Sequence, residues 1–299
     1  MGSVKVAGGI LAALSLAGCA QFGKSEGNKH ENRQVASIRD SDLFDSTGFL
    51  NVQGVQFKMG SPNNGPIRMN DEILHPVWIT KDFDIQTTEI TQKQWVSIMK
   101  YNPSKTRKKE NCPADFVEDQ NITMCPQNPV DNVSWRDVQE FISELNKISD
   151  RYAYRLPTEA EWELAARGGT EAEYSFGADK NLLSHYGWFK DNAAKQSQVV
   201  GRKMPNPIGL YDMHGNVWEW VEDSYSVYYG PISLKDALFM RVSDKPVKDP
   251  VVVHNGDLKV IRGGSWNYPE VYLRSASRQS YEKDSGRKDI GFRLVRTAR

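Results

Sequence analysis

The sequence has few cysteines, no excess of either charge and no long apolar run. Its 38 Lys and Arg residues are matched by 38 Asp and Glu residues, so it lacks the basic surplus that nucleic-acid-binding proteins use to neutralise phosphates. No apolar run reaches the ~18 residues of a membrane-spanning helix. With 39% apolar residues and 8 Trp in 299 residues, a packed core is expected. A nucleic-acid-binding protein, a polytopic membrane protein and a disordered chain are therefore not expected.

Residues 1–18 resemble the signal peptide of a bacterial lipoprotein. Lys5 precedes an apolar run over residues 6–16, and small residues lead to Cys19. This resemblance implies that Cys19 is lipidated and anchors the mature protein to the membrane. The alternative is a buried N-terminal helix with a chance cysteine. Because Ala20 follows Cys19 where Asp would mark inner-membrane retention, the expected location is the bacterial cell envelope, at the outer membrane and either periplasmic or surface-exposed.

Two cysteines remain once Cys19 is set aside. Cys112 and Cys125 lie in a polar segment of the chain. An even remainder in an exported protein predicts a disulfide, which in the chain-entropy model contributes ~3 kcal/mol for a loop of this length. The alternative is a pair of metal-binding thiolates, but no His or further Cys lies nearby in the sequence to complete such a site.

The remaining chain divides into a polar tether and one domain. Residues 19–47 have alternating charges and no apolar periodicity, which is typical of a flexible tether. Apolar alternation begins at Gly48, and residues 48–299 are predicted to form a single domain. Beyond Gly169 the sequence is rich in Gly, Asn, Pro and aromatic residues, which indicates a loop-rich fold held together by aromatic packing.

Three helices are predicted from their start signals. Each begins after a capping residue, which is Thr91, Ser134 or Thr158. Asp137 and Glu161 lie three residues after the second and third caps, where a capping box places its acidic residue. With their caps included, these positions predict helical segments over 91–99, 134–149 and 158–168, the last of them closed by Gly168.

Six motifs occur in a fixed order along the predicted domain. They are TTEITQKQW, PVDNVSWRDVQEF, YRLPTEAEWELAARGG, NPIGLYDMHGNVWEWVED, VIRGGSW, and RSASR followed by GFRLVR. Together they resemble the formylglycine-generating enzyme family, also called the sulfatase-modifying factor family. The resemblance covers residues 48–296 and implies a single α+β domain of low regular secondary structure, related to the C-type lectin fold.

Most of the motif residues are expected to support the fold. The tryptophans carry large apolar areas to bury. The arginines present a rigid fork that binds carboxylates through two hydrogen bonds. We expect Arg155, Arg278 and Arg293 to pair with buried acids, for which the candidates are Glu159, Glu161 and Glu219.

The resemblance fails at the residues that carry the family's chemistry. Family members with formylglycine-generating activity use two cysteines, five residues apart and just after Gly-Gly-Ser, to bind copper and attack a substrate thiol. Here Tyr268 stands where the first cysteine belongs, and no Cys follows Cys125. A tyrosine cannot supply a thiolate's nucleophilicity or copper affinity at neutral pH. We therefore expect no copper and assign no catalytic residue.

One motif suggests a cation site. In the family, the segment matching LYDMHGNVWEW wraps a calcium ion with oxygen ligands. Carried over, the ligands are the side chains of Asp212 and Glu219 and the carbonyls of Gly215 and Val217. Hard oxygen donors suit Ca²⁺. The alternative is that both carboxylates only bond backbone groups in a tight turn.

Two functions follow from the scaffold without its thiols. The first is a non-catalytic, lipid-anchored protein that binds a protein or glycan ligand at the cell envelope through residues 267–272 and 279–283. Tyr, Asn and Ser are common contact residues in such surfaces. The residues assigned to ligand binding are Trp266, Asn267, Tyr268, Glu270, Tyr272, Arg274, Ser280 and Tyr281.

The second function is a cysteine-independent enzyme or maturation factor of the same family. A polar cluster at the former active site, such as Ser265, Tyr268, Arg274 and Arg278, would favour it. The C-terminal pattern also resembles that of variable proteins diversified by retroelements, which would be a special case of the binding protein.

Overall fold

The computed structural model describes residues 43–44, 48–62, 68–227, 229 and 244–299. All of them belong to one compact unit, Ile38–Arg299. The predicted signal peptide 1–18 and the lipidation site Cys19 lie outside the described residues. None of the helices in the described part of the chain is long and apolar enough to cross a membrane.

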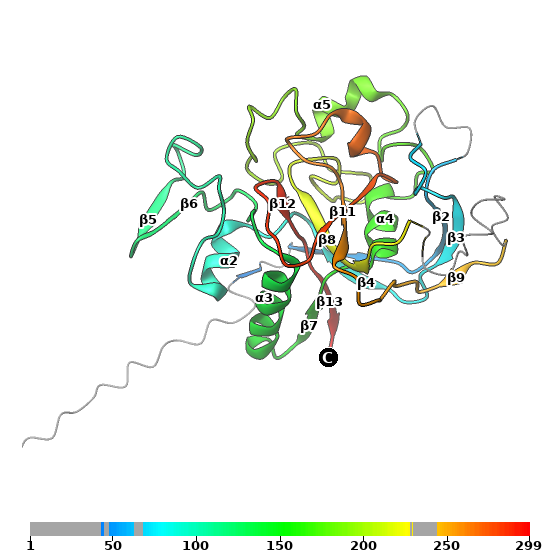
Figure 1. Cartoon of the computed structure of the whole chain (residues 1–299), viewed down its shortest axis with the longest axis horizontal. Helices are drawn as coiled ribbons and strands as arrows, with labels where there is room; N and C mark the ends of the chain where they lie inside the picture. The colour runs from blue at the N-terminus through cyan, green and yellow to red at the C-terminus, as the bar shows by residue number, and fades with distance from the viewer. Residues whose placement is uncertain (1–42, 45–47, 63–67, 228, 230–243) are drawn as a thin grey trace, which may run out of the picture. The chain divides into compact units, whose positions relative to one another are not determined.

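The fold is α+β, with short strands and few helices, as the resemblance implied (Figure 1). One four-stranded antiparallel sheet has the order β1–β4–β13–β7, and it joins the start of the domain to its end. Its strands are β1 Phe49–Val52, β4 Phe83–Gln86, β13 Val295–Ala298 and β7 Tyr152–Arg155.

A second four-stranded sheet, in the order β11–β10–β8–β12, is formed by the C-terminal part of the chain, which contains several of the motifs. Its strands are β11 Arg278–Glu282, β10 Leu258–Arg262, β8 Trp218–Ser224 and β12 Ile290–Gly291. The pairings are antiparallel except that β12 runs parallel to β8. A smaller sheet contains β2 Gln56–Met59, β3 His75–Trp78 and β9 Val247–Lys248.

The three predicted helices are confirmed, and each end lies within one residue of the predicted segment. They are α2 Gln92–Met99, α3 Trp135–Ile148 and α4 Glu159–Arg167, and each begins with a complete capping box. Gly168 ends α4 in the left-handed conformation, with φ of 55°, which glycine adopts without a Cβ penalty. The shorter helical elements are η1 Lys180–Leu182, α5 Leu183–Tyr186 and η2 Glu270–Leu273.

The predicted disulfide is confirmed. Cys112 and Cys125 are bonded, with their Cα atoms 5.7 Å apart. They close the base of a hairpin made of β5 Val117–Asp119 and β6 Ile122–Met124, which lies at the edge of the fold beside α2 (Figure 1).

The predicted tether ends too late in the sequence. Phe44, which was assigned to it, is 6% exposed and lies with its ring 5.3 Å from that of Phe49 and 5.6 Å from that of Tyr154. Gln94 also donates a hydrogen bond to the carbonyl of Leu43. The core therefore includes a residue before Gly48, because the aromatic side chain of Phe44 is buried although its sequence neighbours are polar.

The arginine struts are confirmed with their partners. The bidentate pairs are Arg155 with Glu161, Arg278 with Glu159, and Arg293 with Glu219, all with N–O distances of 2.6–2.8 Å. Arg278, Arg293 and their partners are almost completely buried. Removing one member of a buried ion pair is strongly destabilising. The pairs of Arg278 and Arg293 therefore hold distant parts of the chain together and are not available to bind a substrate.

Candidate ligand-binding surface

The backbone that presents Tyr268 depends on two glycines after β10. Gly263 and Gly264 have φ of 92° and 77°, and a Cβ on Gly264 would lie 2.8 Å from the side chain of Leu273. The turn then continues into Ser265, whose hydroxyl donates a hydrogen bond to Asp289 at 2.9 Å. Only glycine permits this close approach, so the family's Gly-Gly-Ser segment sets the position of the residues that follow it.

Tyr268 and Tyr272 pack on a buried tryptophan. The ring of Trp218, from β8, lies 5.4 Å from that of Tyr268 and 6.5 Å from that of Tyr272, and the two tyrosine rings are 5.1 Å apart. All three contacts are edge-to-face, the arrangement that aromatic quadrupoles favour. Both tyrosines remain half-buried, so they form a rigid aromatic surface rather than a core.

Arg287 joins this pair to Tyr281. Its guanidinium carbon lies 5.4 Å from the Tyr268 ring centre and 4.9 Å from the Tyr281 ring centre. Asp289 fixes the guanidinium with an ion pair of 2.5 Å. The neighbouring Lys288 is exposed, with its ammonium 4.9 Å from the ring centre of Trp266. Cations are attracted to the faces of aromatic rings, so the loop before β12 adds positive charge to the aromatic surface.

Ring and cation contacts bring Tyr268, Tyr272 and Tyr281 to one region, whereas Ser280 pairs with Val260 and lies on the opposite face of β11 from Tyr281. Among the predicted ligand-binding residues, Asn267 is exposed, and five others are half-buried: Tyr268, Glu270, Tyr272, Ser280 and Tyr281. The basic residues Arg287 and Lys288 belong to the same surface but were missed. Their charge, directly before the GFRLVR motif, was the signal that could have found them.

Two of the predicted ligand contacts are wrong. Arg274 is 1% exposed and forms a bidentate ion pair with Glu72, at 2.6 and 2.7 Å. Trp266 is 3% exposed and packs on Trp188, so it supports the surface from below. Both residues lie in the predicted segment, but their side chains point into the protein. Sequence reasoning missed this because burial depends on contacts with residues far away in the chain.

The position five residues after Tyr268, where the second cysteine would stand, holds Leu273. This side chain is fully buried in a small cluster with Tyr174 and Leu183. Its carbonyl accepts a hydrogen bond from Nδ1 of His214, because Nε2 of that ring accepts one from the backbone N–H of Ser175. Burial lowers the pKa of His214 to about 4, so the neutral ring serves to fix the loop.

The predicted calcium ligand Glu219 does not have a free carboxylate. Both of its oxygens accept hydrogen bonds from Arg293, and one also accepts from the indole of Trp162 at 2.7 Å. Because a guanidinium already neutralises this carboxylate, Glu219 does not fit the role of a cation ligand. Among the described residues, no group of three or more His, Cys, Asp or Glu side chains is arranged to hold a metal ion.

Asp212 has one free oxygen and an unexpected neighbour, Glu89. The Oδ2 atom of Asp212 accepts from the N–H of Gly201 at 2.7 Å, whereas Oδ1 has no partner among the described residues. Both carboxylate oxygens of Glu89 are also buried without a partner. Burial and then the charge of Asp212 raise the pKa of Glu89 well above its usual value. Burial raises the pKa of Asp212 to about 6.

These three unpartnered oxygens fit a cation or a proton. Two neighbouring buried carboxylates cannot both stay ionised unless positive charge offsets them, and Arg293, whose charge lowers the pKa of both, is already paired with Glu219. Ca²⁺ takes oxygen ligands of this type, and carbonyls of the turn through Gly215 and Val217 follow Asp212 directly. Glu89 lies in the TTEITQKQW motif, and sequence reasoning missed it because the motif had been assigned to the fold.

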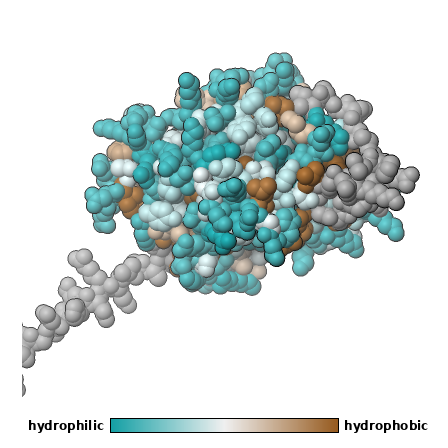
Figure 2. All heavy atoms as spheres, in the orientation of Figure 1, coloured by the Kyte–Doolittle hydropathy of each residue, from teal (hydrophilic) through white to brown (hydrophobic). Residues whose placement is uncertain are grey.

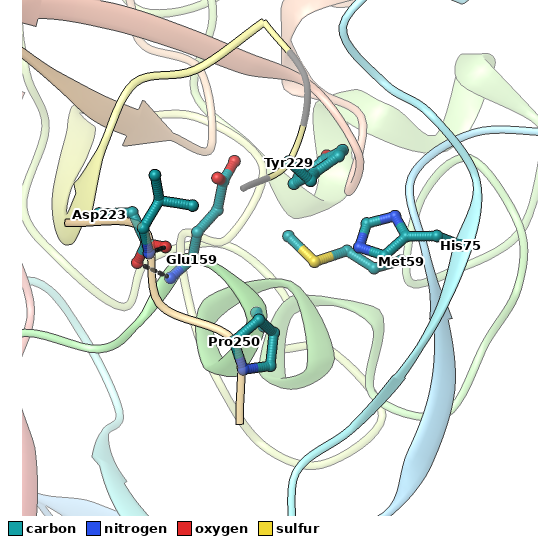
Figure 3. A pocket seen from close by; sticks show the side chains of 8 residues that line it. Met59, His75, Glu159, Asp223, Tyr229 and Pro250 are labelled. Atoms are coloured by element: carbon teal, nitrogen blue, oxygen red, sulfur yellow. Dashed lines mark hydrogen bonds between the residues drawn. The ribbon is translucent and has the colours of Figure 1, made fainter. Parts of the chain in front are cut away.

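A separate small cavity lies between α4 and β3 (Figure 3). Its lining includes His75, Glu159, Asp223 and Tyr229, and the N–H of Glu159 donates to Asp223 at 2.8 Å. Burial raises the pKa of Asp223 to about 7 and lowers that of His75. The free volume of about 10 Å³ is the size needed for one water molecule, so this cavity is part of the buried charge network rather than a ligand site.

Residues 36–298 match the sulfatase-modifying factor enzyme 1-like domain. The chain belongs to this family. It is 29% identical over 242 residues to a formylglycine-generating enzyme of Streptomyces coelicolor, which covers 76% of this chain and 68% of the relative. It is also 25% identical over 279 residues to the serine/threonine-protein kinase pkn1 of Chlamydia caviae, of which it spans only 41%.

Solved structures show the same fold. The chain superimposes on Treponema denticola variable protein 1 with a TM-score of 0.66 and 25% identity, covering 83% of this chain and 94% of that one. PvdO from Pseudomonas aeruginosa gives a TM-score of 0.66 with 26% identity over 83% and 93% of the two chains. The similarity therefore establishes the fold of this chain. Its function has to be inferred from the residues at the site.

Proposed function

We propose that this protein is a non-catalytic, lipid-anchored binding protein of the bacterial cell envelope, and that its partner contacts the surface around Tyr268, Tyr272 and Tyr281. The observation that carries this proposal is what stands in place of the family's thiols. Tyr268 is packed edge-on against Trp218, and Leu273 is buried. The two positions of the family's cysteines therefore hold no thiol, and the first presents an aromatic ring fixed by packing. Large aromatic side chains commonly contribute most of the binding energy at interfaces.

The alternative of an altered enzyme or maturation factor finds less support at this site. Ser265 is fully buried and bonded to Asp289, and Arg274 and Arg278 are held by buried glutamates. The polar cluster that would favour catalysis is therefore used to hold the fold. The similarity to the formylglycine-generating enzyme of Streptomyces coelicolor is the remaining support for this alternative, which an activity assay tests.

Calcium is a separate part of the proposal. We propose that Ca²⁺ binds at Asp212 and Glu89, with Glu219 held aside by Arg293. The three buried oxygens without partners support this assignment, and the ion would neutralise two carboxylates that otherwise share a proton. Its role would be to fix the turn that precedes β8, next to Trp218.

Location and diversification are proposals from the sequence. Lipidation at Cys19 would anchor the domain at the outer membrane, and labelling with a palmitate analogue should be lost in Cys19→Ala. The similarity to Treponema denticola variable protein 1 supports the retroelement version of the binding protein. A nearby reverse-transcriptase gene and a second copy of the coding segment for residues 261–296, differing mainly at adenines, would establish it, and their absence would leave an ordinary binding lipoprotein.

The binding function is tested by comparing capture of envelope proteins and glycans by the wild type and by a variant with Tyr268, Tyr272 and Tyr281 changed to Ala. Loss of the captured partner in the variant, with an unchanged circular dichroism spectrum, is the expected result. Equal recovery by both proteins would refute the placement of the site. Oxidation of a thiol-containing sulfatase peptide by the copper-loaded protein would refute the non-catalytic function as a whole.

A further inference from the structure

We propose that the partner of the aromatic surface is an acidic peptide segment of another protein, bound by hydrogen-bond donors and cations gathered around Tyr268. This inference rests on the proposed binding function and names the chemistry of the partner. The supporting observation is the chemistry of the surface, which has hydrogen-bond donors and positively charged side chains.

The first group of donors is formed by the tyrosine hydroxyls. The hydroxyls of Tyr268, Tyr272 and Tyr281 are hydrogen-bonded to no described residue, and none of them is a buried atom. Each of these hydroxyls is therefore at least partly exposed, on rings that are linked by Arg287, which contacts both Tyr268 and Tyr281. A hydroxyl in this setting can donate to a carboxylate of a partner.

The second group of donors lies directly below. The indole N–H groups of Trp188, Trp218 and Trp266 are buried and have no acceptor among the described residues. A buried donor left without a partner costs ~1–3 kcal/mol, so acceptor oxygens from water or from a ligand would be favourable here. Trp218 supports the two tyrosines and Trp266 contacts Lys288, so these N–H groups lie beneath the surface, where an acceptor reaches them only by entering between the rings.

The charges around the tyrosines point the same way. Lys190 and Lys288 are exposed and have no ion-pair partner among the described residues, and the N–H of Lys190 donates to the carbonyl of Tyr268 at 3.1 Å. The nearby acids are mostly engaged. Asp289 is buried against Arg287, and Glu270 lies 3.6 Å from Lys180. Asp191, beside Lys190, and Glu282, next to Tyr281 in the sequence, are exposed and form no ion pair with a described residue.

A peptide fits these features better than a neutral glycan does. Complementary charge steers association and suppresses wrong partners, and tyrosines with arginine are typical anchors of protein interfaces. Figure 2 shows that the face of the domain in that orientation is largely hydrophilic, with hydrophobic residues in small separate patches. Recognition by a broad apolar patch is therefore not supported on that face.

The test uses a random-peptide phage library selected on the purified protein. We expect the selected peptides to be enriched in Asp and Glu. Replacing those acids by Asn and Gln in one synthetic peptide should weaken its binding at least ~10-fold, measured by fluorescence anisotropy. The double variant Lys190→Glu and Lys288→Glu should weaken binding to a similar degree. Lys109→Glu changes an exposed lysine three residues before Cys112; it is the matched control and should leave binding unchanged.

The variant with Tyr268, Tyr272 and Tyr281 changed to Phe keeps the rings and removes the hydroxyls, so it should fold normally and bind the acidic peptide more weakly. Enrichment of neutral or basic peptides, no enrichment over a protein-free surface, or preferential binding of an uncharged glycan on an array would overturn the inference. If tyrosine-dependent capture persists without sensitivity to charge, the proposed function stands and this inference fails. If the Ala variant binds the peptides as well as the wild type, the proposed function itself fails.

Discussion

Arg293 binds Glu219 through two hydrogen bonds of 2.7 Å at a site where neither side chain is exposed to solvent. The same guanidinium donates to the carbonyls of Gln86 and Tyr211. One side chain from the end of the chain therefore holds together β8, the end of β4 and the turn before Asp212. It also satisfies the carboxylate that sequence reasoning had given to calcium.

We predict that Arg293→Ala destabilises the protein by ~3–5 kcal/mol, because it leaves the carboxylate of Glu219 buried without its charge partner. Urea denaturation followed by tryptophan fluorescence measures this loss. Arg136→Ala is the control, since the Arg136–Asp284 pair is more than half exposed and such pairs contribute less than ~1 kcal/mol. Similar losses in both variants would contradict the structural role given to Arg293.

The Glu89–Asp212 pair predicts a pH dependence with a definite sign. Because folding raises the pKa of Asp212 to about 6, the folded state holds a proton that the unfolded state releases near pH 4. The stability from this proton is complete at low pH and is lost as the pH rises from about 4 to about 6. In chelator, the melting temperature should fall over this range and continue to fall above it, because the pKa of Glu89 is raised well above its usual value. Glu89→Gln should flatten the fall.

Addition of Ca²⁺ at neutral pH should raise the melting temperature of the wild type, because a ligand that binds only the native state stabilises it by mass action. Glu89→Gln and Asp212→Asn should abolish this rise, whereas Glu219 should not be tested alone because its loss also unpairs Arg293. An identical melting curve in excess chelator and in Ca²⁺, with no metal found by elemental analysis, would contradict the calcium proposal and leave the shared proton as the explanation.

Removing the disulfide should weaken the protein without changing its fold. In the chain-entropy model, replacing Cys112 and Cys125 by Ser costs ~3 kcal/mol for a closed loop of this length. The double variant should unfold at lower urea concentration, and reducing agent should shift the wild type but not the variant. An unchanged midpoint in the double variant would show that the hairpin is held by its other contacts.

Gly264→Ala is predicted to disrupt the binding surface from behind. The residue has a φ of 77°, and its Cβ would lie 2.8 Å from the Leu273 side chain and 2.9 Å from the Tyr272 carbonyl. The strain should displace the loop that carries Tyr268, with a loss of stability of ~1–3 kcal/mol. Gly169→Ala is the matched control, because it also has a positive φ but no atom within 4 Å of the added Cβ. Equal effects would mean that backbone conformation alone, and not the contact with Leu273, is responsible.

The features that the sequence determined by itself are local or have only one suitable partner. Capping boxes are confined to four consecutive residues, so Thr91, Ser134 and Thr158 marked their helices correctly. Two cysteines left in the chain could pair only with each other. Buried arginines need carboxylates, so the three arginines and the three glutamates could be named from the motifs, although which arginine binds which glutamate was left open.

The tertiary structure alone decided which side chains turn inward. Arg274 meets Glu72 across 202 residues of sequence, and Glu89 meets Asp212 across the domain. The sequence pattern of one helix or strand does not predict such a contact, because the burial and the pKa of a side chain depend on all the groups around it. The same holds for Arg287, which became part of the surface only when β11 and β12 brought it between Tyr268 and Tyr281.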